Sequence, residues 1–369
     1  MTFLPIRGNG RSHKLAQPIR YSGVVRRLTW RYVFFALGTA LLVWLLDRIG
    51  LGEIWTMARR LGWWSSGGFV VVYALHQLLR AGALYRCVVR PGSVRFTDAL
   101  AVRLSGEGAQ VLTAGGAAVG EPLKAWLLTR RGLSGQEGLA ATLSDFLVYK
   151  FISALVMLAG LTYLAWRVEL PAAFAAAARV FAVGAVVFLV VSGIAIARRT
   201  YVIGSVAALA ARIPGLARRI GYAPAWVRGM EDLIFRVLRD EPRRFAGVLA
   251  FDVAAHLLLV LELWLLLHVL ELPHPLFHGW LVDAATKPLG GLFFFVPGQV
   301  GALEASLAAV FTAIGLPPAA GVVVALVRRA RSLLVAAVGL AGLWWLGKGG
   351  EQPNAQRRTP SDERPAPRA

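Results

Sequence analysis

The sequence predicts an all-α polytopic membrane protein, and three observations support this fold class. Hydrophobic residues make up 57% of the 369 residues, charged residues only 16%, and the mean hydropathy is +0.60. Apolar stretches of roughly spanning length recur along the chain, and arginine-rich segments separate several of them. The charge is lopsided, with 40 Lys+Arg against 20 Asp+Glu. Because a soluble domain needs far more polar surface, this composition argues strongly against soluble enzymes.

The basic residues predict the topology. The first 31 residues carry no acid and hold a run of cations: Arg7, Arg11, Lys14, Arg20, Arg26, Arg27 and Arg31. Cytoplasmic segments of membrane proteins are enriched in Lys and Arg, so we expect residues 1–31 to stay in the cytoplasm. In a membrane chain the net charge of +20 indicates basic loops beside anionic lipid headgroups, and not nucleic-acid binding.

Six apolar stretches are candidates for spanning helices, of which most approach the length needed and two are short. They cover residues 32–46, 61–79, 146–166, 180–197, 245–270 and 332–346. Residues 198–244 hold ten arginines against four acids, which predicts a cytoplasmic loop with surface-lying helices. Residues 347–369 are rich in Pro, Arg and polar residues, which predicts a disordered tail. The transmembrane domain is therefore expected over 32–346 of a multi-pass, bacterial-type cytoplasmic (inner) membrane protein with both termini in the cytoplasm.

Two further stretches, 96–131 and 277–316, are apolar but interrupted by glycine, proline and acidic residues. In the first, Gly115 is followed by Glu121 and then by Gly132-Leu133. In the second, Gly298, Glu304 and Gly315-Leu316 follow at an offset of 183 throughout. Each stretch precedes an apolar helix, so we predict repeats over about 96–166 and 277–346. Three predicted spans separate the two stretches, which makes the hairpins re-entrant from opposite sides and the repeats inverted, as in many transporters.

Glu121 and Glu304 lie where half-helices would begin. The second half-helix has room for only about 12 residues before Gly315, roughly 18 Å, which is too short to span. Irregular backbone at membrane depth needs protein or water around it, so we expect both breaks to face a shared cavity with these two glutamates at its centre. The carboxylates would either cap helix ends or bind protons or cations during transport, and the sequence leaves both interpretations open.

Residues 115–124, with Gly115, Gly120, Glu121 and Lys124, and residues 296–304, with Pro297, Gly298, Gly301 and Glu304, carry a resemblance to a known family. They resemble the two signature segments of the lysylphosphatidylglycerol synthase transmembrane (flippase-like) family, which includes a hopanoid-associated branch. The resemblance implies a membrane unit that moves or holds lipids, with these residues at its substrate or translocation site. It does not imply lysyl transfer, because the soluble aminoacyltransferase domain of the bifunctional members is not expected after residue 346. The chain departs from the pattern at Pro122, Lys124 and Ser144-Asp145.

Four cations near the second hairpin are candidate anchors for a lipid headgroup: Lys287, Arg328, Arg329 and Arg331. The arginines precede the last predicted span on the side assigned as external, where cations oppose the inside bias. A charge near the membrane needs a partner. That partner would be a lipid phosphate, the interfacial water, or an acid such as Glu304.

Other ionisable residues within the predicted spans are weaker candidates. Asp252 and His256 are spaced i,i+4 and form either a structural ion pair or a proton relay. His76, Gln77 and Arg80 close the second predicted span, and we expect them at the membrane interface. Asp145 is expected to anchor a helix end. Glu107 and Gln110 are expected to line the cavity from the cytoplasmic side.

Enzyme motifs are absent from the sequence. It contains no HExxH, no Cys/His metal spacing, no GxxxxGK[ST] and no GxSxG, and Cys87 is the single cysteine. We therefore expect no metal, no cofactor and no ATP-driven step in this chain. The sequence favours a lipid transporter that binds an amphipathic lipid, namely a phospholipid, an aminoacyl-lipid or a hopanoid. The alternatives are an intramembrane enzyme, or an accessory or scaffold subunit of a lipid-modification pathway, with a homo-oligomer or a lipid-synthesis enzyme as partner.

Overall fold

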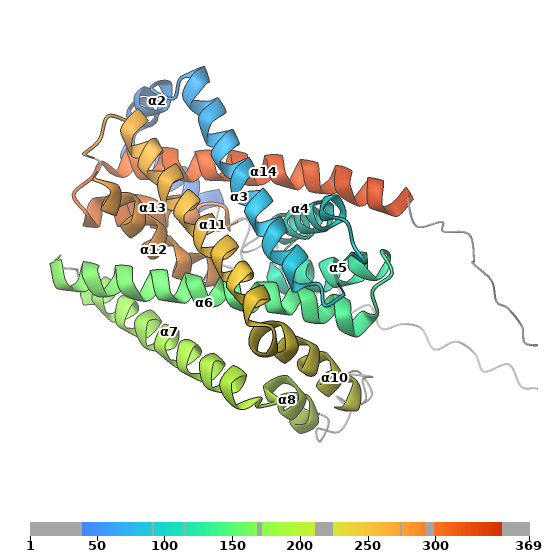
Figure 1. The fold of residues 1–369 in the computed structure, drawn as a ribbon. Helices are drawn as coiled ribbons and strands as arrows, with labels where there is room; N and C mark the ends of the chain where they lie inside the picture. Colours follow the sequence, from blue (N-terminus) through green and yellow to red (C-terminus); the bar gives the residue numbers. More distant parts are fainter. Residues whose placement is uncertain are drawn as a thin grey trace, which may run out of the picture.

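The fold is a bundle of long and short helices (Figure 1). The computed structural model describes residues 39–90, 92–113, 116–167, 172–210, 224–273, 275–292 and 299–348. Within these ranges all regular secondary structure is helical. After a helix over 39–49, the elements are α2 (Leu51–Arg59), α3 (Trp63–Cys87), α4 (Phe96–Leu112), α5 (Ala117–Thr129), α6 (Gly135–Arg167), α7 (Ala172–Arg198), α8 (Val202–Ala210), α10 (Pro224–Phe235), the π-helix η1 (Arg236–Asp240), α11 (Pro242–Val269), α12 (Leu276–Leu292), α13 (Ala302–Ala313) and α14 (Pro318–Lys348).

Four helices of the described residues are long and apolar enough to cross a membrane: Ser66–Cys87, Gly135–Trp166, Ala175–Arg198 and Pro242–Val269. They contain or overlap four of the six predicted spans, and the prediction of an all-α polytopic membrane protein is confirmed. Residues 39–46 of the predicted span 32–46 lie in the helix over 39–49, and residues 32–38 lie outside the described residues. The sixth, 332–346, is the second half of α14, which begins earlier, at Pro318, and carries three arginines near its middle.

The backbone repeats with the offset read from the sequence. Helices α6 and α14 begin at residues 135 and 318, which are 183 apart. The turns before them match: Gly132 and Gly315 have φ angles of 91° and 76°, in the left-handed region that favours glycine. The following leucines close the same helix-capping bond, Leu133 N to Leu128 O at 3.4 Å and Leu316 N to Phe311 O at 2.8 Å. Both half-helices therefore end by one and the same local mechanism.

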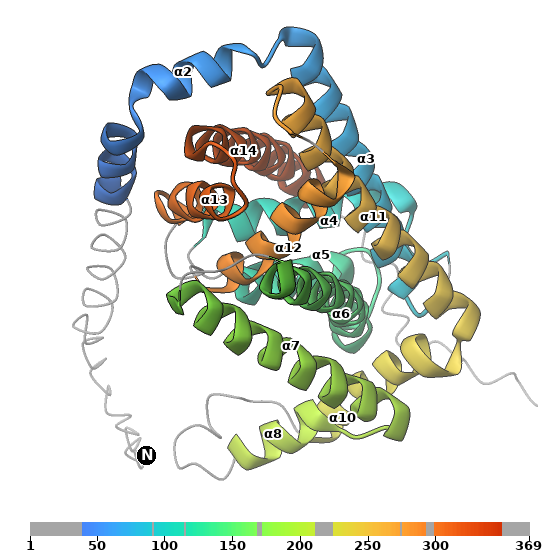
Figure 2. The same ribbon diagram turned by 90° about the vertical axis from the view of Figure 1, so that its left-hand side faces the viewer.

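The two halves run in opposite directions. Figure 1 shows α6 and α14 lying antiparallel, and Figures 1 and 2 show α3 and α11 crossing with opposite directions. The halves also exchange partners, because α4 of the first packs on α14 of the second, while α12 of the second packs on α6 of the first. Arginines near the starts of α3 and α11 bond to the chain just after the other of these two helices: Arg60, which precedes α3, donates to Leu270 O at 2.8 Å, and Arg244, in the first turn of α11, donates to Val89 O at 3.3 Å.

Each predicted re-entrant stretch consists of two helices separated by a break. The first is α4 and α5, and the second is α12 and α13, whose 12 residues match the predicted half-helix. Gly116 and Gln299, again 183 residues apart, have left-handed φ angles of 48° and 52° where the chain enters the second helix. Gly115, Pro297 and Gly298 lie outside the described residues.

Small residues allow the helices of the two halves to cross closely. A Cβ added to Gly339 of α14 would lie 2.3 Å from the backbone oxygen of Leu104 on α4. A Cβ added to Gly160 of α6 would lie 2.2 Å from the Cβ of Ala284 on α12. These contacts bring polar side chains of the two halves into one interior, since the helix backbones approach without bulky residues between them.

The basic segment 198–244 holds short helices, as predicted. Helix α10 packs on α6 and α8, and the carboxylate of Glu231 accepts hydrogen bonds from the backbone N–H groups of Ile203 (2.7 Å) and Gly204 (3.0 Å) at the start of α8. Residues 211–223 of this segment lie outside the described residues, as do the predicted basic N-terminus and nearly all of the predicted tail.

Candidate functional site

Fourteen charged side chains meet in direct ion pairs inside the bundle, and we call this set the polar core. Its members come from α3–α6 and α11–α14, so both repeats contribute. They are the cations Arg80, Arg103, Lys124, Lys287, Arg328, Arg329 and Arg331, and the acids Glu107, Glu121, Asp145, Asp252, Glu262, Asp283 and Glu304. Buried charges of this kind are rare in membrane helices and mark pathways for ions or polar groups.

The first group of the polar core is built around Arg80. Its guanidinium lies between Asp145 on α6, where Nη2 is 3.0 Å from Oδ2, and Asp252 on α11, which it also contacts directly. Lys124 Nζ on α5 lies 2.7 Å from Glu121 Oε2 and 3.7 Å from Asp145 Oδ2. These five residues form the Arg80 cluster, in which the side chain of Glu121, the most accessible, is only 8% exposed.

The second group is centred on Glu107 of α4. Its carboxylate accepts hydrogen bonds from the Tyr73 hydroxyl (2.7 Å), Gln77 Nε2 (2.9 Å) and Arg103 Nη2 (3.0 Å). Arg331 of α14 lies with its guanidinium carbon 3.7 Å from the centre of the Tyr73 ring and pairs with Glu262 of α11. Tyr73 therefore joins two ion pairs, Arg103–Glu107 and Arg331–Glu262.

The third group lies at the second hairpin. Asp283 of α12 pairs with Lys287 (2.8 Å) and with Arg328 of α14 (3.7 Å). Arg328 also donates to the Thr286 hydroxyl at 3.2 Å. Arg329 pairs with Glu304 of α13 at 2.6 Å and donates to the Gln299 backbone oxygen at 3.3 Å. We call Asp283, Lys287, Glu304, Arg328 and Arg329 the Arg328 cluster.

The structure gives every predicted anchor cation an acidic partner. The sequence left three partners open for these cations: a lipid phosphate, interfacial water or an acid. The structure contains the pairing with acids, and Arg329 binds the predicted acid, Glu304. Lys124 likewise binds Glu121. Within the described residues, Glu121 and Glu304 bind side chains rather than the free amides at the helix starts, so the capping interpretation is not what these contacts show.

Two predicted glycines have local roles at the half-helices. A Cβ added to Gly120 would lie 2.3 Å from Gln110 Cγ, so this glycine lets Gln110 reach Glu121, which it contacts at 3.3 Å. Gly301, with a φ angle of 76°, lies directly before α13.

The predicted ion pair between Asp252 and His256 is wrong. The Asp252 carboxylate binds Arg80, and His256 instead contacts the Asp252 backbone oxygen through Nδ1 and the Ser153 hydroxyl through Nε2, both at 2.9 Å. Since α3 and α11 cross, the guanidinium of Arg80 on α3 reaches the carboxylate. A proton relay through these residues stays a prediction.

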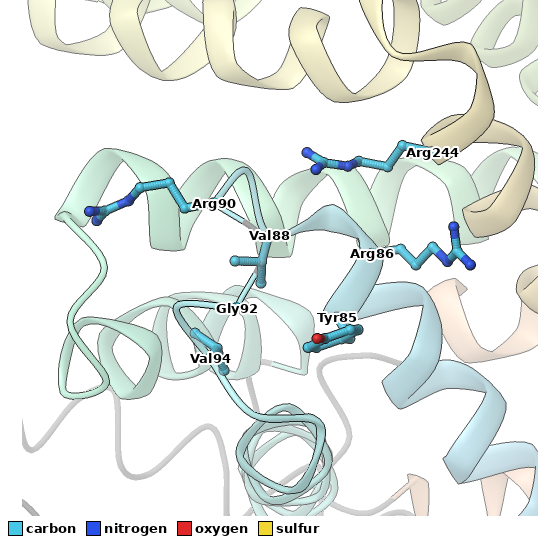
Figure 3. A pocket seen from close by; sticks show the side chains of 7 residues that line it. All are labelled: Tyr85, Arg86, Val88, Arg90, Gly92, Val94 and Arg244. Carbon is cyan, nitrogen blue, oxygen red and sulfur yellow. The ribbon is translucent and has the colours of Figure 1, made fainter.

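The expected open cavity between the hairpins also needs correction. Glu121 and Glu304 are 6% and 0% exposed, and ion pairs occupy the space around them. A pocket of about 220 Å³ lies elsewhere, at the end of α3, and is lined by Tyr85, Arg86, Val88, Arg90, Gly92, Val94 and Arg244. Figure 3 shows the guanidinium groups of Arg86 and Arg90 pointing in opposite directions. The pocket is therefore a basic surface at a helix end, where Arg90 is held by Glu137 at 2.7 Å.

Sequence reasoning missed Arg80 and misplaced Asp145. Arg80 was expected at an interface, but it is 1% exposed and lies inside α3, which continues to Cys87. Asp145 was expected to anchor a helix end, but it lies inside α6 and is 0% exposed. The length of the helix could have revealed this position. If the predicted span 61–79 is extended to residue 87, Arg80 lies within the helix and no longer at its end.

Several polar atoms of this interior lack a hydrogen-bond partner within the described residues. They include both ring nitrogens of His76, Asp145 Oδ1, Asp252 Oδ2 and Glu262 Oε1. Leaving such atoms buried costs free energy, so water or the polar groups of a ligand normally satisfy them. In the described part of the chain, no group of three or more His, Cys, Asp or Glu side chains fits a metal ion.

The sequence was compared with protein-family models, with curated proteins and with solved structures. A family model described as the lysylphosphatidylglycerol synthase TM region matches residues 31–339, which include the whole polar core. No curated protein and no solved structure matches the chain.

Proposed function

Because the chain belongs to the lysylphosphatidylglycerol synthase transmembrane family, whose members are membrane proteins of lipid handling, we propose that it binds an amphipathic lipid and moves it between leaflets. The headgroup passes along the polar core while the acyl chains stay in the surrounding lipid. In this proposal the chain is a transporter and not an enzyme. It lies in the cytoplasmic membrane, with the basic loops on the cytoplasmic side.

The observation that carries this proposal is the position of the polar core. Seven cations and seven acids of the described residues lie where the two antiparallel repeats cross. A buried ion pair adds little stability compared with a well-packed apolar pair, so stability alone is a poor reason for so many of them. Paired charges can exchange partners with a charged headgroup, and transporters form their substrate sites at repeat interfaces.

Within the polar core, the Arg328 cluster is the best candidate for holding a lipid phosphate. It has three cations, Lys287, Arg328 and Arg329, for two acids, Asp283 and Glu304. Guanidinium groups bind phosphate oxygens in charge-assisted, often bidentate hydrogen bonds. Arg328 is the most weakly paired of the three cations, because its nitrogen lies 3.7 Å from the Asp283 carboxylate and its other partner is the neutral Thr286 hydroxyl. A phospholipid or an aminoacyl-phospholipid supplies this phosphate, whereas a hopanoid substrate would need to carry one in its headgroup.

The substitution Arg328→Gln tests the proposal. We expect it to lower the initial rate of lipid translocation about tenfold or more, since a hydrogen bond to a charged group contributes about 1.5–3 kcal/mol. The measurement uses vesicles of phosphatidylcholine and phosphatidylglycerol with an acyl-labelled phosphatidylglycerol, whose exposure to a membrane-impermeant quencher reports its leaflet.

The matched control is Arg228→Gln, which removes an arginine from the exposed surface of α10. It should translocate lipid like the unmodified protein. If Arg328→Gln and Arg228→Gln both kept the full rate at equal protein per vesicle, the Arg328 cluster would not be the headgroup site. If the unmodified protein moved no labelled lipid above empty vesicles, the transport proposal would fail.

A further inference from the structure

The Arg80 cluster contains more acids than cations. Arg80 and Lys124 face three carboxylates: Glu121, Asp145 and Asp252. The side chains of Arg80, Asp145 and Asp252 are 2%, 0% and 0% exposed, so water does not screen the excess negative charge. Asp145 and Asp252 share the single guanidinium of Arg80 through one oxygen each, and their other oxygens, Asp145 Oδ1 and Asp252 Oδ2, have no hydrogen-bond partner in the described residues.

Three buried carboxylates that share two cations leave one negative charge uncompensated in the Arg80 cluster, which favours the uptake of a proton there. Because Asp145 and Asp252 contact the same guanidinium, a proton taken up here is shared by the pair. We propose that Asp145 and Asp252 form an exchangeable proton site, and that this site takes up a proton when an anionic headgroup enters the polar core. The inference rests on the proposed function and adds the ion that moves with the lipid.

The distribution of charge in the polar core supports this coupling. The Arg80 cluster has one acid too many, and the Arg328 cluster has one cation too many. The second group, Arg103, Glu107, Glu262 and Arg331, is balanced. A phosphate diester bound at the Arg328 cluster adds one negative charge, and a proton on the Asp145–Asp252 pair compensates it. The interior then keeps its net charge while the headgroup crosses, which avoids burying an uncompensated charge.

The groups around the pair come from every helix that packs on it. The Tyr149 ring lies 4.0 Å from the guanidinium carbon of Arg80 and 4.6 Å from the His256 ring. His256 is beside the pair but its ring nitrogens are used by Asp252 O and Ser153, so it is not a partner of either carboxylate. The charged and titratable neighbours are His76, Arg80 and Cys87 of α3, Arg103 of α4, Glu121 and Lys124 of α5, Tyr149 and the exposed Lys150 of α6, His256 of α11, and Asp283 and Lys287 of α12.

The proton balance is simple. The proton comes from water on one side, forms an O–H bond on one carboxylate of the pair, and returns to water on the other side, while no other bond is made or broken. Movement of a phosphatidylglycerol anion together with one proton is electrically neutral.

The experiment measures lipid and proton movement together. Vesicles of phosphatidylcholine and phosphatidylglycerol hold the full-length protein, an acyl-labelled phosphatidylglycerol in the outer leaflet and a pH-sensitive dye inside. With the outside more acidic by one pH unit, we expect inward lipid movement to accelerate by up to about tenfold, since proton activity differs tenfold. The inside should acidify in proportion to the lipid moved. The proposal is overturned if lipid moves at the same rate with and without the gradient.

Asp252→Asn removes one carboxylate of the pair at nearly constant size, and Asp145→Asn is a second variant in case the first does not fold. Either should abolish the acceleration by the gradient. Asp232→Asn, on the exposed face of α10, is the matched control and should keep it. An Asp252→Asn protein that still responds fully to the gradient would overturn the proposal.

A second measurement separates this inference from transport itself. Short-chain phosphatidylglycerol is added to the detergent-solubilised protein in weak buffer, and proton uptake is read from a pH indicator. About one proton taken up per bound lipid supports the proton site even if no lipid crosses vesicles. Binding without any proton uptake overturns the proton site even if translocation is observed.

Discussion

Replacing Arg80 by Leu should destabilise the protein by about 3–5 kcal/mol, because removing one partner of a buried ion pair leaves the other charge buried and uncompensated. Here two carboxylates, Asp145 and Asp252, would lose their guanidinium partner at once. The measurement is thermal unfolding of the purified protein in detergent, followed by its intrinsic tryptophan fluorescence.

The control for Arg80 is Arg86→Leu, in the last turn of the same helix. Arg86 is exposed and, within the described residues, forms no ion pair, so its loss should change stability by about 0.5 kcal/mol or less. Adding Asp252→Asn to Arg80→Leu should recover part of the lost stability, since one of the two stranded charges is then removed. Equal melting temperatures for Arg80→Leu and Arg86→Leu would show that the Arg80 cluster is not a buried ion-paired group.

Gly339→Val should also destabilise strongly, because α14 crosses α4 at this residue. The new Cβ would lie 2.3 Å from Leu104 O and 2.9 Å from Leu104 C, both backbone atoms that cannot move without shifting α4. Overpacking of a well-packed interior typically costs about 1–3 kcal/mol, and a clash with backbone places this site at the upper end. The measurement is again thermal unfolding in detergent.

The matched control is Gly193→Val in α7, where an added Cβ has no neighbour within 4 Å. It makes the same chemical change in a helix, so it reports the effect of the side chain without the clash. If both valine variants unfolded at the same temperature, the close crossing of α4 and α14 would be contradicted.

The fold followed from the sequence where the signal was local. Apolar runs located four of the spanning helices, and the glycines at 132 and 315 ended both half-helices where the offset of 183 placed them. The prediction stopped α3 at residue 79, because His76, Gln77 and Arg80 lower the local hydropathy. Gln77 and Arg80 are tolerated inside the helix because α4, α6 and α11 supply polar partners for them, while the His76 ring stacks on Tyr73. Partners so distant in sequence leave no local signal.

The same limit applied to the candidate site. The sequence singled out Glu121 and Glu304 as candidate site residues and predicted that the arginines at 328, 329 and 331 need partners, and the structure brings all five into one polar core. What the sequence could not predict is which partner each takes. Arg331 pairs with Glu262 of α11, although nothing in the helical periodicity of α11 relates the two residues. Asp252 pairs with Arg80 and not with the nearby His256. The choice depends on how α3 crosses α11 and how α14 packs on α4, which are tertiary properties.

The central claim is that a lipid headgroup enters the polar core, and photo-crosslinking tests it most directly. A phospholipid with a photoreactive group on its headgroup is incorporated into vesicles with the protein, and adducts are mapped by mass spectrometry of the peptides. We predict adducts around residues 283–287 and 328–331, and none there with the same group on the acyl tail. Adducts confined to the exposed apolar face of α7 for both probes would contradict the claim.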